Sequence, residues 1–230
     1  MRISLIIVTL ALINSSLALE EPAGVPSTVK RIAEGLYEYG SVSIDAAKRQ
    51  ITFPAVINQV EGNVEYAVVH EDGKTHESLI ATKVRSTELQ VALLLCRFVE
   101  TSKEAPDPKG KLGIWIDWED TKAKPQSVPL HRWVYNGLKR EALSKHVWLF
   151  TGVPKAKPGK PPIDDQSVIA IFNDPYAAIN CFDPKSINDD LWYPSKDQLP
   201  EIDTPVTVRI APFTNESTTN TTVNSNNAKP

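Results

Sequence analysis

Short apolar segments that end at turn residues recur along this chain, and they limit most strongly what it can fold into. Residues 40–45 alternate polar and apolar side chains, and after a turn residues 50–53 return with a similar alternation. Pro54 is expected to end that strand or to place it at a sheet edge, because proline donates no ladder hydrogen bond. Further strands are predicted at residues 112–119, 128–135, 147–151, 168–172 and 205–211.

One more hairpin and one long apolar segment complete the predicted fold. The hairpin joins residues 64–70 to residues 74–80 through the turn Asp72-Gly73. Residues 87–99 are predicted to form the principal helix, which should be buried on most sides because few of its residues are polar. Shorter helices are expected at residues 27–34 and 138–145. The fold class is therefore predicted to be α+β, a mainly antiparallel β-sheet with one principal buried helix.

The first eighteen residues have the composition of a signal peptide. Arg2 supplies a short positive region, residues 3–13 are apolar, and Ser16-Leu17-Ala18 offers small residues to a signal peptidase. The apolar run is well below the roughly 20 residues that span a bilayer, so we expect cleavage after about Ala18. The mature protein is then predicted to be exported, either to the periplasm or outside the cell.

The rest of the chain is expected to contain one folded domain. Residues 19–35 form a lead-in, residues 36–213 the domain, and residues 214–230 a polar tail. The tail has too few apolar side chains to offset the entropy of ordering, so it is predicted to be disordered. No segment after the signal is apolar enough to span a membrane.

Charge and cysteine content exclude several classes of partner and cofactor. The chain has 25 basic and 28 acidic residues and a formal net charge of −3, without a basic stripe, so nucleic acid is not an expected partner. Two cysteines are too few for an iron–sulfur cluster, which usually needs four ligands. Because Cys96 ends the apolar run 91–96, two buried thiols are favoured, although export permits a disulfide between Cys96 and Cys181. No cofactor is expected.

The segment His76-Glu77-Ser78 is the strongest candidate for chemistry. A zinc-hydrolase motif needs a second histidine four residues after the first, and here that position is Ile80. A serine nucleophile needs a base and an orienting carboxylate, but on a strand His76 and Ser78 share one face while Glu77 points to the other. The chain also lacks a Gly-x-Ser-x-Gly elbow. The pattern favours a structural or binding role, with a hydrolase that uses Ser78 and His76 as the alternative.

Two further patterns keep other kinds of site open. His70 and His76 would meet across the predicted hairpin if its register places them opposite, and Glu65 or Glu77 would complete a metal site. The tryptophans would supply a sugar-stacking surface if they were exposed, but at strand spacing they favour the core. They are Trp115, Trp118, Trp133, Trp148 and Trp192.

Several segments together carry a family resemblance that covers about residues 36–211. They are residues 42–45, 51–58, 64–66, 76–79, 90–95, 173–180, 189–192 and 204–208. In these segments the chain resembles the YdjY-type domain family of exported bacterial proteins. The resemblance implies export and a shared fold, and it implies no reaction. Some relatives carry a ferredoxin-type label, which does not transfer because this chain has no cysteine cluster.

The sequence as a whole predicts an exported, non-catalytic domain that binds a protein or a small ligand. A hydrolase and a metal-binding module are the alternatives, and no catalytic, cofactor-binding or metal-ligating residue is assigned. The candidate binding surface consists of Asn58, His76, Glu77, Ser78, Asn180 and Asp190.

Overall fold

The computed structural model describes residues 28–145, 148–154, 165–183 and 188–213. The predicted signal peptide and polar tail lie outside these residues. The strands are β1 (Lys30–Ala33), β2 (Leu36–Tyr39), β3 (Val42–Asp45), β4 (Gln50–Ile57), β5 (Tyr66–His70), β6 (Ser78–Thr82), β7 (Lys111–Glu119), β8 (Pro125–Pro129), β9 (Val134–Asn136), β10 (Glu141–Ala142), β11 (Trp148–Phe150), β12 (Ser167–Ala170), β13 (Ile179–Cys181), β14 (Trp192–Pro194) and β15 (Pro205–Pro212). The helices are α1 (Ser86–Leu95) and the short 3-10 helices η1 (Thr75–Glu77), η2 (Pro108–Gly110), η3 (Leu130–Trp133), η4 (Asp189–Leu191) and η5 (Lys196–Gln198).

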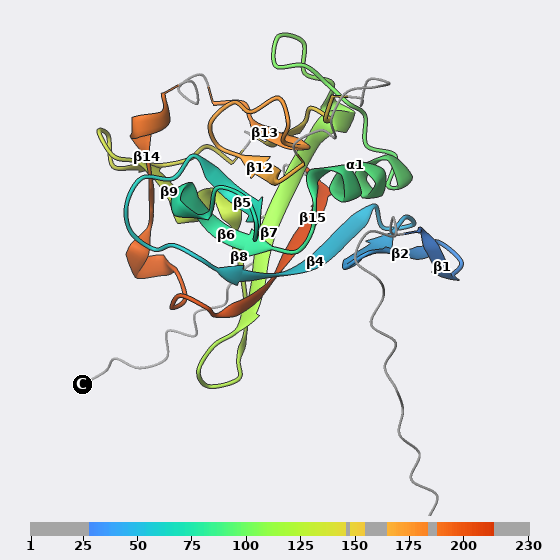
Figure 1. Ribbon diagram of the computed structural model, residues 1–230, viewed down its shortest axis with the longest axis horizontal. Coiled ribbons are helices and arrows are strands. Elements are labelled where there is room, and N and C mark those ends of the chain that lie inside the picture. The colour runs from blue at the N-terminus through green and yellow to red at the C-terminus, as the bar shows by residue number, and fades with distance from the viewer. Residues whose placement is uncertain (1–27, 146–147, 155–164, 184–187, 214–230) are drawn as a thin grey trace, which may run out of the picture.

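Eight strands close into a β-barrel. Hydrogen-bonded neighbours follow the order β4-β15-β7-β11-β13-β12-β5-β6, and β6 pairs with β4 to complete the ring. The long strands β7 and β15 run side by side through the molecule (Figure 1). Strands make up 41% of the structure and helices 15%. The predicted α+β class, a mainly antiparallel sheet with a principal helix at about 87–99, is therefore wrong. Local patterns indicate strands, but they do not indicate that the first and last strands of a sheet meet.

Apolar side chains fill the interior of the barrel. Val208 on β15 pairs with Phe53 on β4 and with Ile116 on β7, and all three are buried. Ile80 on β6 pairs in the same way with Val68 on β5. Directly paired residues share a face, so these side chains point to one interior. An eight-stranded barrel is just wide enough for side chains to fill it, so the interior is a packed core.

Two neighbouring pairs of strands in the barrel are parallel. β5 and β6 are parallel, with Tyr66 opposite Ser78, and β12 and β13 are also parallel. The connections, residues 71–77 and 171–178, are far shorter than the usual helical crossover. The predicted hairpin across Asp72-Gly73 is therefore wrong. The chain does turn there, but it returns to the level of Tyr66 before it enters β6.

Proline is accommodated inside β4, where the sequence predicted a strand end or an edge. Pro54 pairs with Thr207 of β15, and its carbonyl, on the other side of the strand, accepts a hydrogen bond of 2.7 Å from Thr82 Oγ1. On that side β4 pairs with β3 only up to Thr52 and with β6 only from Val56. The missing N–H of Pro54 therefore falls in a gap between two partner strands, where no ladder bond is lost.

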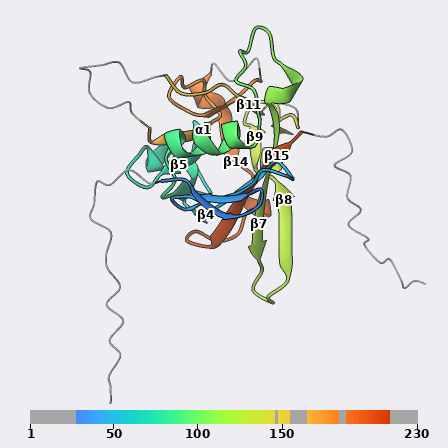
Figure 2. The same ribbon diagram turned by 90° about the vertical axis from the view of Figure 1, so that its right-hand side faces the viewer.

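Helix α1 lies across one end of the barrel (Figure 2). Ser86 N at its start donates to Asp165 O ahead of β12, and Arg49 Nε donates to the carbonyl of Cys96 just after its end. Its apolar face, including Leu89 and Leu93, is buried in the core. The helix ends at Leu95, four residues before the predicted limit. No helix in the described part of the chain is long and apolar enough to cross a membrane.

Three other local predictions are also corrected. The expected helix at residues 27–34 contains β1, and the one at residues 138–145 contains β10. The expected strand at residues 128–135 is divided among β8, η3 and β9. Trp133, Trp148 and Trp192 are at most 2% exposed, so these three cannot form a sugar-stacking surface.

Candidate functional site

The loop between β5 and β6 brings four of the predicted site residues together. Asn58 follows β4, and its Nδ2 donates to the carbonyl oxygens of Thr75 and Ser78, both at 2.6 Å. The His76 side chain is 75% exposed, and its Nε2 lies 3.2 Å from Glu77 Oε1. Strand alternation predicted that Glu77 points away from His76. That prediction is wrong because Thr75–Glu77 forms η1 and the strand begins only at Ser78.

Ser78 is buried beneath this loop. Its hydroxyl is fully shielded from solvent and donates a hydrogen bond of 2.5 Å to the carbonyl oxygen of Lys74. A serine nucleophile needs a hydroxyl that faces both a base and the substrate. Here the hydroxyl faces the backbone, so the geometry opposes the hydrolase hypothesis and assigns Ser78, with Asn58, to closing the barrel.

Asn180 and Asp190 lie in different surroundings. Asn180 is buried, and its side chain bonds to both the N–H and the carbonyl of Asp174, at 2.9 and 2.8 Å, and to Thr151 Oγ1 at 2.8 Å. It therefore holds the 171–178 loop in shape. Asp190 is exposed on η4, and its amide donates to Asn188 Oδ1 at 3.0 Å. No interaction between described residues joins Asp190 to the other five.

The two short crossover loops meet at Tyr66, which the sequence did not single out. Lys74 Nζ, from the first loop, donates to the Tyr66 hydroxyl at 3.1 Å. That hydroxyl donates in turn to Asp174 Oδ2, from the second loop, also at 3.1 Å. Glu65 Oε2 and Glu77 Oε2 each lie 3.9 Å from Lys74 Nζ. We call the set Lys74, Tyr66 and Asp174 the tyrosine bridge. It links Asn180 at one end to Glu77 and His76 at the other.

Protonation states follow from this arrangement. Burial raises the pKa of the Tyr66 phenol above its ordinary value of 10.0, an effect that the Lys74 ammonium partly opposes. The hydrogen bond to Tyr66 is the main reason why the pKa of Lys74 lies above its ordinary value of 10.5. At neutral pH Tyr66 is therefore neutral and Lys74 charged. Neither is a ready proton acceptor, since a general base works best with a pKa near the operating pH.

The tyrosine bridge lies in a surface cleft of about 320 Å³, which we call the bridge cleft. Its lining combines the bridge with polar groups from Gln166 and Asn173 and with the 42% exposed ring of Tyr176. Small-molecule sites typically join a few convergent polar groups to an aromatic or apolar wall. The 71–77 loop also contributes Thr75 and His76 to a second, more open cleft of about 560 Å³ beside Asn58.

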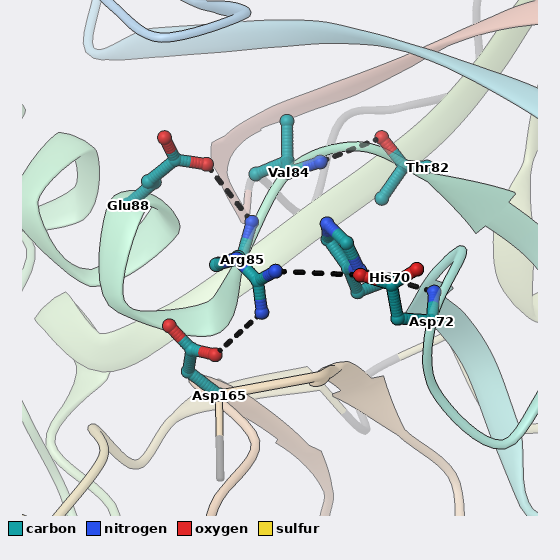
Figure 3. Close-up of polar contacts among 7 residues, drawn as sticks. All are labelled: His70, Asp72, Thr82, Val84, Arg85, Glu88 and Asp165. Atoms are coloured by element: carbon teal, nitrogen blue, oxygen red, sulfur yellow. Dashed lines mark hydrogen bonds and ion pairs between the residues drawn. The ribbon is translucent and has the colours of Figure 1, made fainter. Parts of the chain in front are cut away.

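A second polar cluster surrounds the start of α1 (Figure 3). Arg85 lies between two carboxylates, with Nη1 2.9 Å from Asp165 Oδ1 and Nη2 3.5 Å from Asp72 Oδ2. Nδ1 of the buried His70 accepts from the Asp72 amide at 3.1 Å. These bonds join the 71–77 loop, α1 and the chain ahead of β12. The role of this polar cluster is therefore structural.

The pairing of His70 with His76, which a suitable hairpin register would have allowed, does not occur. The parallel register sets His70 opposite Thr82 on β6, and His76 lies in the crossover. Within the described ranges, no group of three or more His, Cys, Asp or Glu side chains is arranged to hold a metal ion.

No family model, curated protein or solved structure matches this chain. The resemblance to YdjY-type domains therefore stays a prediction.

Proposed function

We propose that this chain is an exported, non-catalytic domain that binds a small polar ligand in the bridge cleft. One observation carries the proposal: the Tyr66 hydroxyl is held between the Lys74 ammonium and the Asp174 carboxylate in a surface cleft. A cation, an anion and a hydroxyl thus converge on a small volume, where they are already oriented by one another. Export rests on the sequence pattern of residues 1–18.

The size and chemistry of the cleft favour a small ligand over a protein surface. A volume of about 320 Å³ lies at the lower end of the range for small-molecule sites. Lys74 offers a donor to a carboxylate or hydroxyl oxygen, and Asp174 accepts from an amine or hydroxyl. The exposed ring of Tyr176 adds a flat apolar wall beside them.

The protonation states support binding in preference to catalysis. Both raised pKa values keep Lys74 cationic and Tyr66 neutral at neutral pH, so Lys74 acts as a donor and the Tyr66 hydroxyl keeps the proton that it donates to Asp174. Fixed donors and acceptors orient a ligand without exchanging protons with it. The buried Ser78 offers no nucleophile to the same cleft.

A ligand screen tests the proposal. The purified chain would be mixed with panels of amino acids, monosaccharides and small organic acids, and stabilisation would be measured by thermal unfolding. Compounds that stabilise the protein should lose at least about tenfold in affinity in Lys74→Gln, because a charge-assisted hydrogen bond is removed, and in Tyr66→Phe, because the hydroxyl that orients Lys74 and Asp174 is removed. Lys109→Gln, which removes an equal charge from η2, is the matched control. Ligands that bind equally well to the two site variants would contradict the proposal, and so would turnover of any compound in the panel.

A further inference from the structure

A separate cleft lies on a second, three-stranded sheet of order β10-β9-β14, away from the tyrosine bridge. It has a volume of about 360 Å³ and lies where β9 and β14 meet η3 and η5. We call it the arginine cleft. Its polar lining includes Arg132, Arg140, Lys196, Tyr135, Ser195 and Gln198.

The charge of this cleft is opposite to that of the whole chain. Three cations and one carboxylate, Asp197, line the cleft, whereas the chain carries a formal net charge of −3. Lys196 is already paired with Glu61. Arg132 and Arg140 make no ion pair with any carboxylate of the described residues and are exposed. Two guanidinium groups are therefore available to a ligand.

The backbone holds one of these arginines in an unusual conformation. Arg140 has a φ of +57°, in the left-handed region that non-glycine residues rarely adopt. Its amide donates to Asn136 O at 2.7 Å, and Asn136 Oδ1 accepts from the amides of Leu138 and Lys139. The turn is thus fixed by Asn136, and it delivers Arg140 to the cleft.

The other polar and aromatic side chains of the arginine cleft indicate which kind of ligand would fit it. The Ser195 hydroxyl makes no capping bond to η5, so it can donate to a ligand. Tyr135 is half-buried, and its ring lies 6.1 Å from that of Tyr193, centroid to centroid. Arginine presents a planar fork of donors that matches phosphate and carboxylate oxygens. Two such forks and a hydroxyl exceed what the two oxygens of a carboxylate can accept, whereas a tetrahedral oxyanion has oxygens for all of them.

We infer that the arginine cleft binds a phosphate or sulfate monoester of about the size of a sugar. Arg132 and Arg140 hold the oxyanion, Ser195 donates a further hydrogen bond, and the Tyr135 ring lies beside the organic group. The volume of about 360 Å³ suits a small organic molecule more than a bare ion. None of these residues belongs to the bridge cleft, so this inference does not depend on the proposed function, and each can be tested without the other.

Titration calorimetry with glucose 6-phosphate, glucose and inorganic phosphate tests the inference at low ionic strength. Glucose 6-phosphate should bind at least about tenfold more tightly than glucose, and added salt should weaken it. Inorganic phosphate should compete for the same site, with a lower affinity than that of glucose 6-phosphate. Arg132→Gln and Arg140→Asn should each reduce its affinity about tenfold or more. Asparagine is chosen at position 140 because it tolerates the left-handed conformation.

Lys139→Gln is the matched control, since it removes an equal charge from the neighbouring residue outside the cleft, and it should bind normally. Thermal unfolding of each variant reports whether it is folded, and if Arg140→Asn is unstable, Arg132→Gln decides the question alone. Equal binding of glucose and glucose 6-phosphate would overturn the inference. So would an equal loss in Lys139→Gln, or no binding of glucose 6-phosphate at millimolar concentration.

Discussion

Tyr66 and Asp174 are 108 residues apart in the chain, yet the Tyr66 hydroxyl donates a hydrogen bond of 3.1 Å to the Asp174 carboxylate. The bond joins the loop after β12 to the first residue of β5. Because Lys74 also donates to this hydroxyl, removing one oxygen atom would break contacts to both crossover loops.

The substitution Tyr66→Phe should therefore destabilise the protein. It removes two hydrogen bonds and leaves the Asp174 carboxylate without its phenol donor, which should cost about 1–3 kcal/mol. Urea unfolding followed by circular dichroism measures the free energy of unfolding. Tyr176→Phe, which removes the hydroxyl of an exposed tyrosine in the same cleft, should change it by less than about 0.5 kcal/mol. If Tyr66→Phe and the unmodified protein had equal free energies of unfolding, the tyrosine bridge would contribute nothing to stability.

Stability should fall in alkaline solution, and the tyrosine bridge should account for part of the fall. The pKa values of Tyr66 and Lys74 are both raised from their ordinary values of 10.0 and 10.5, so the folded state binds more protons than the unfolded state at high pH. Their contribution is complete below about pH 10 and is lost as the pH rises through the folded values. Free energies of unfolding between about pH 8 and 11 should decline more steeply for the unmodified protein than for Tyr66→Phe. If the free energies of unfolding of the two proteins declined in parallel with pH, the prediction would be contradicted.

Asn58→Ala should weaken closure of the barrel between β4 and β6. The amide donates to two carbonyl oxygens, at Thr75 and Ser78, and both would lose this donor, while Thr75 O keeps its bond from the Ser78 N–H. We expect a loss of about 2 kcal/mol in the free energy of unfolding, from two hydrogen bonds of ordinary strength. Asn173→Ala, at an exposed asparagine, serves as the control. Hydrogen exchange should show faster exchange at the amides of β6 in Asn58→Ala only.

The two cysteines should resist thiol reagents in the folded protein. Cys96 and Cys181 are buried thiols that are not joined in a disulfide. Burial raises the pKa of Cys96 to about 11 and that of Cys181 to about 12, so almost no thiolate is present at pH 8. Iodoacetamide at pH 8 followed by mass spectrometry should find both unmodified until guanidinium is added. Rapid labelling of the folded protein, or a bridge that forms during export, would contradict this prediction.

Local sequence patterns were sufficient to predict strands that can be recognised without knowing which strands they pair with. Residues 205–211 alternate apolar and polar side chains, residues 112–119 are rich in β-branched and aromatic side chains, and the two segments form most of β15 and β7. Burial of the Cys96 thiol was also predicted correctly, because the apolar run 91–96 indicates burial without reference to any partner. The prediction that Pro54 ends its strand or lies at a sheet edge was wrong because it depends on the neighbouring strands. Its place in β4 is possible only because β3 and β6 leave a gap on that side.

Four residues of the predicted binding surface lie together in the structure, and their role in binding stays a prediction. His76, Glu77 and Ser78 are adjacent in sequence, whereas Asn58 is brought to the 71–77 loop by the pairing of β4 with β6. Asp72-Gly73, however, is equally compatible with a hairpin and with a tight return to a parallel strand, because the turn itself is local. The parallel register of β5 and β6 decided that Ser78 is buried and that Lys74 reaches Tyr66.

By itself, the sequence determined that this chain is rich in strands, that Cys96 is buried and that the chain begins with the pattern of a signal peptide. These properties depend on composition and on the spacing of neighbouring residues. Closure of the barrel, the two parallel crossovers and the convergence of Lys74, Tyr66 and Asp174 were decided only by tertiary structure. They depend on contacts between distant segments, whose free energy comes from shared burial and leaves no periodicity in either segment alone.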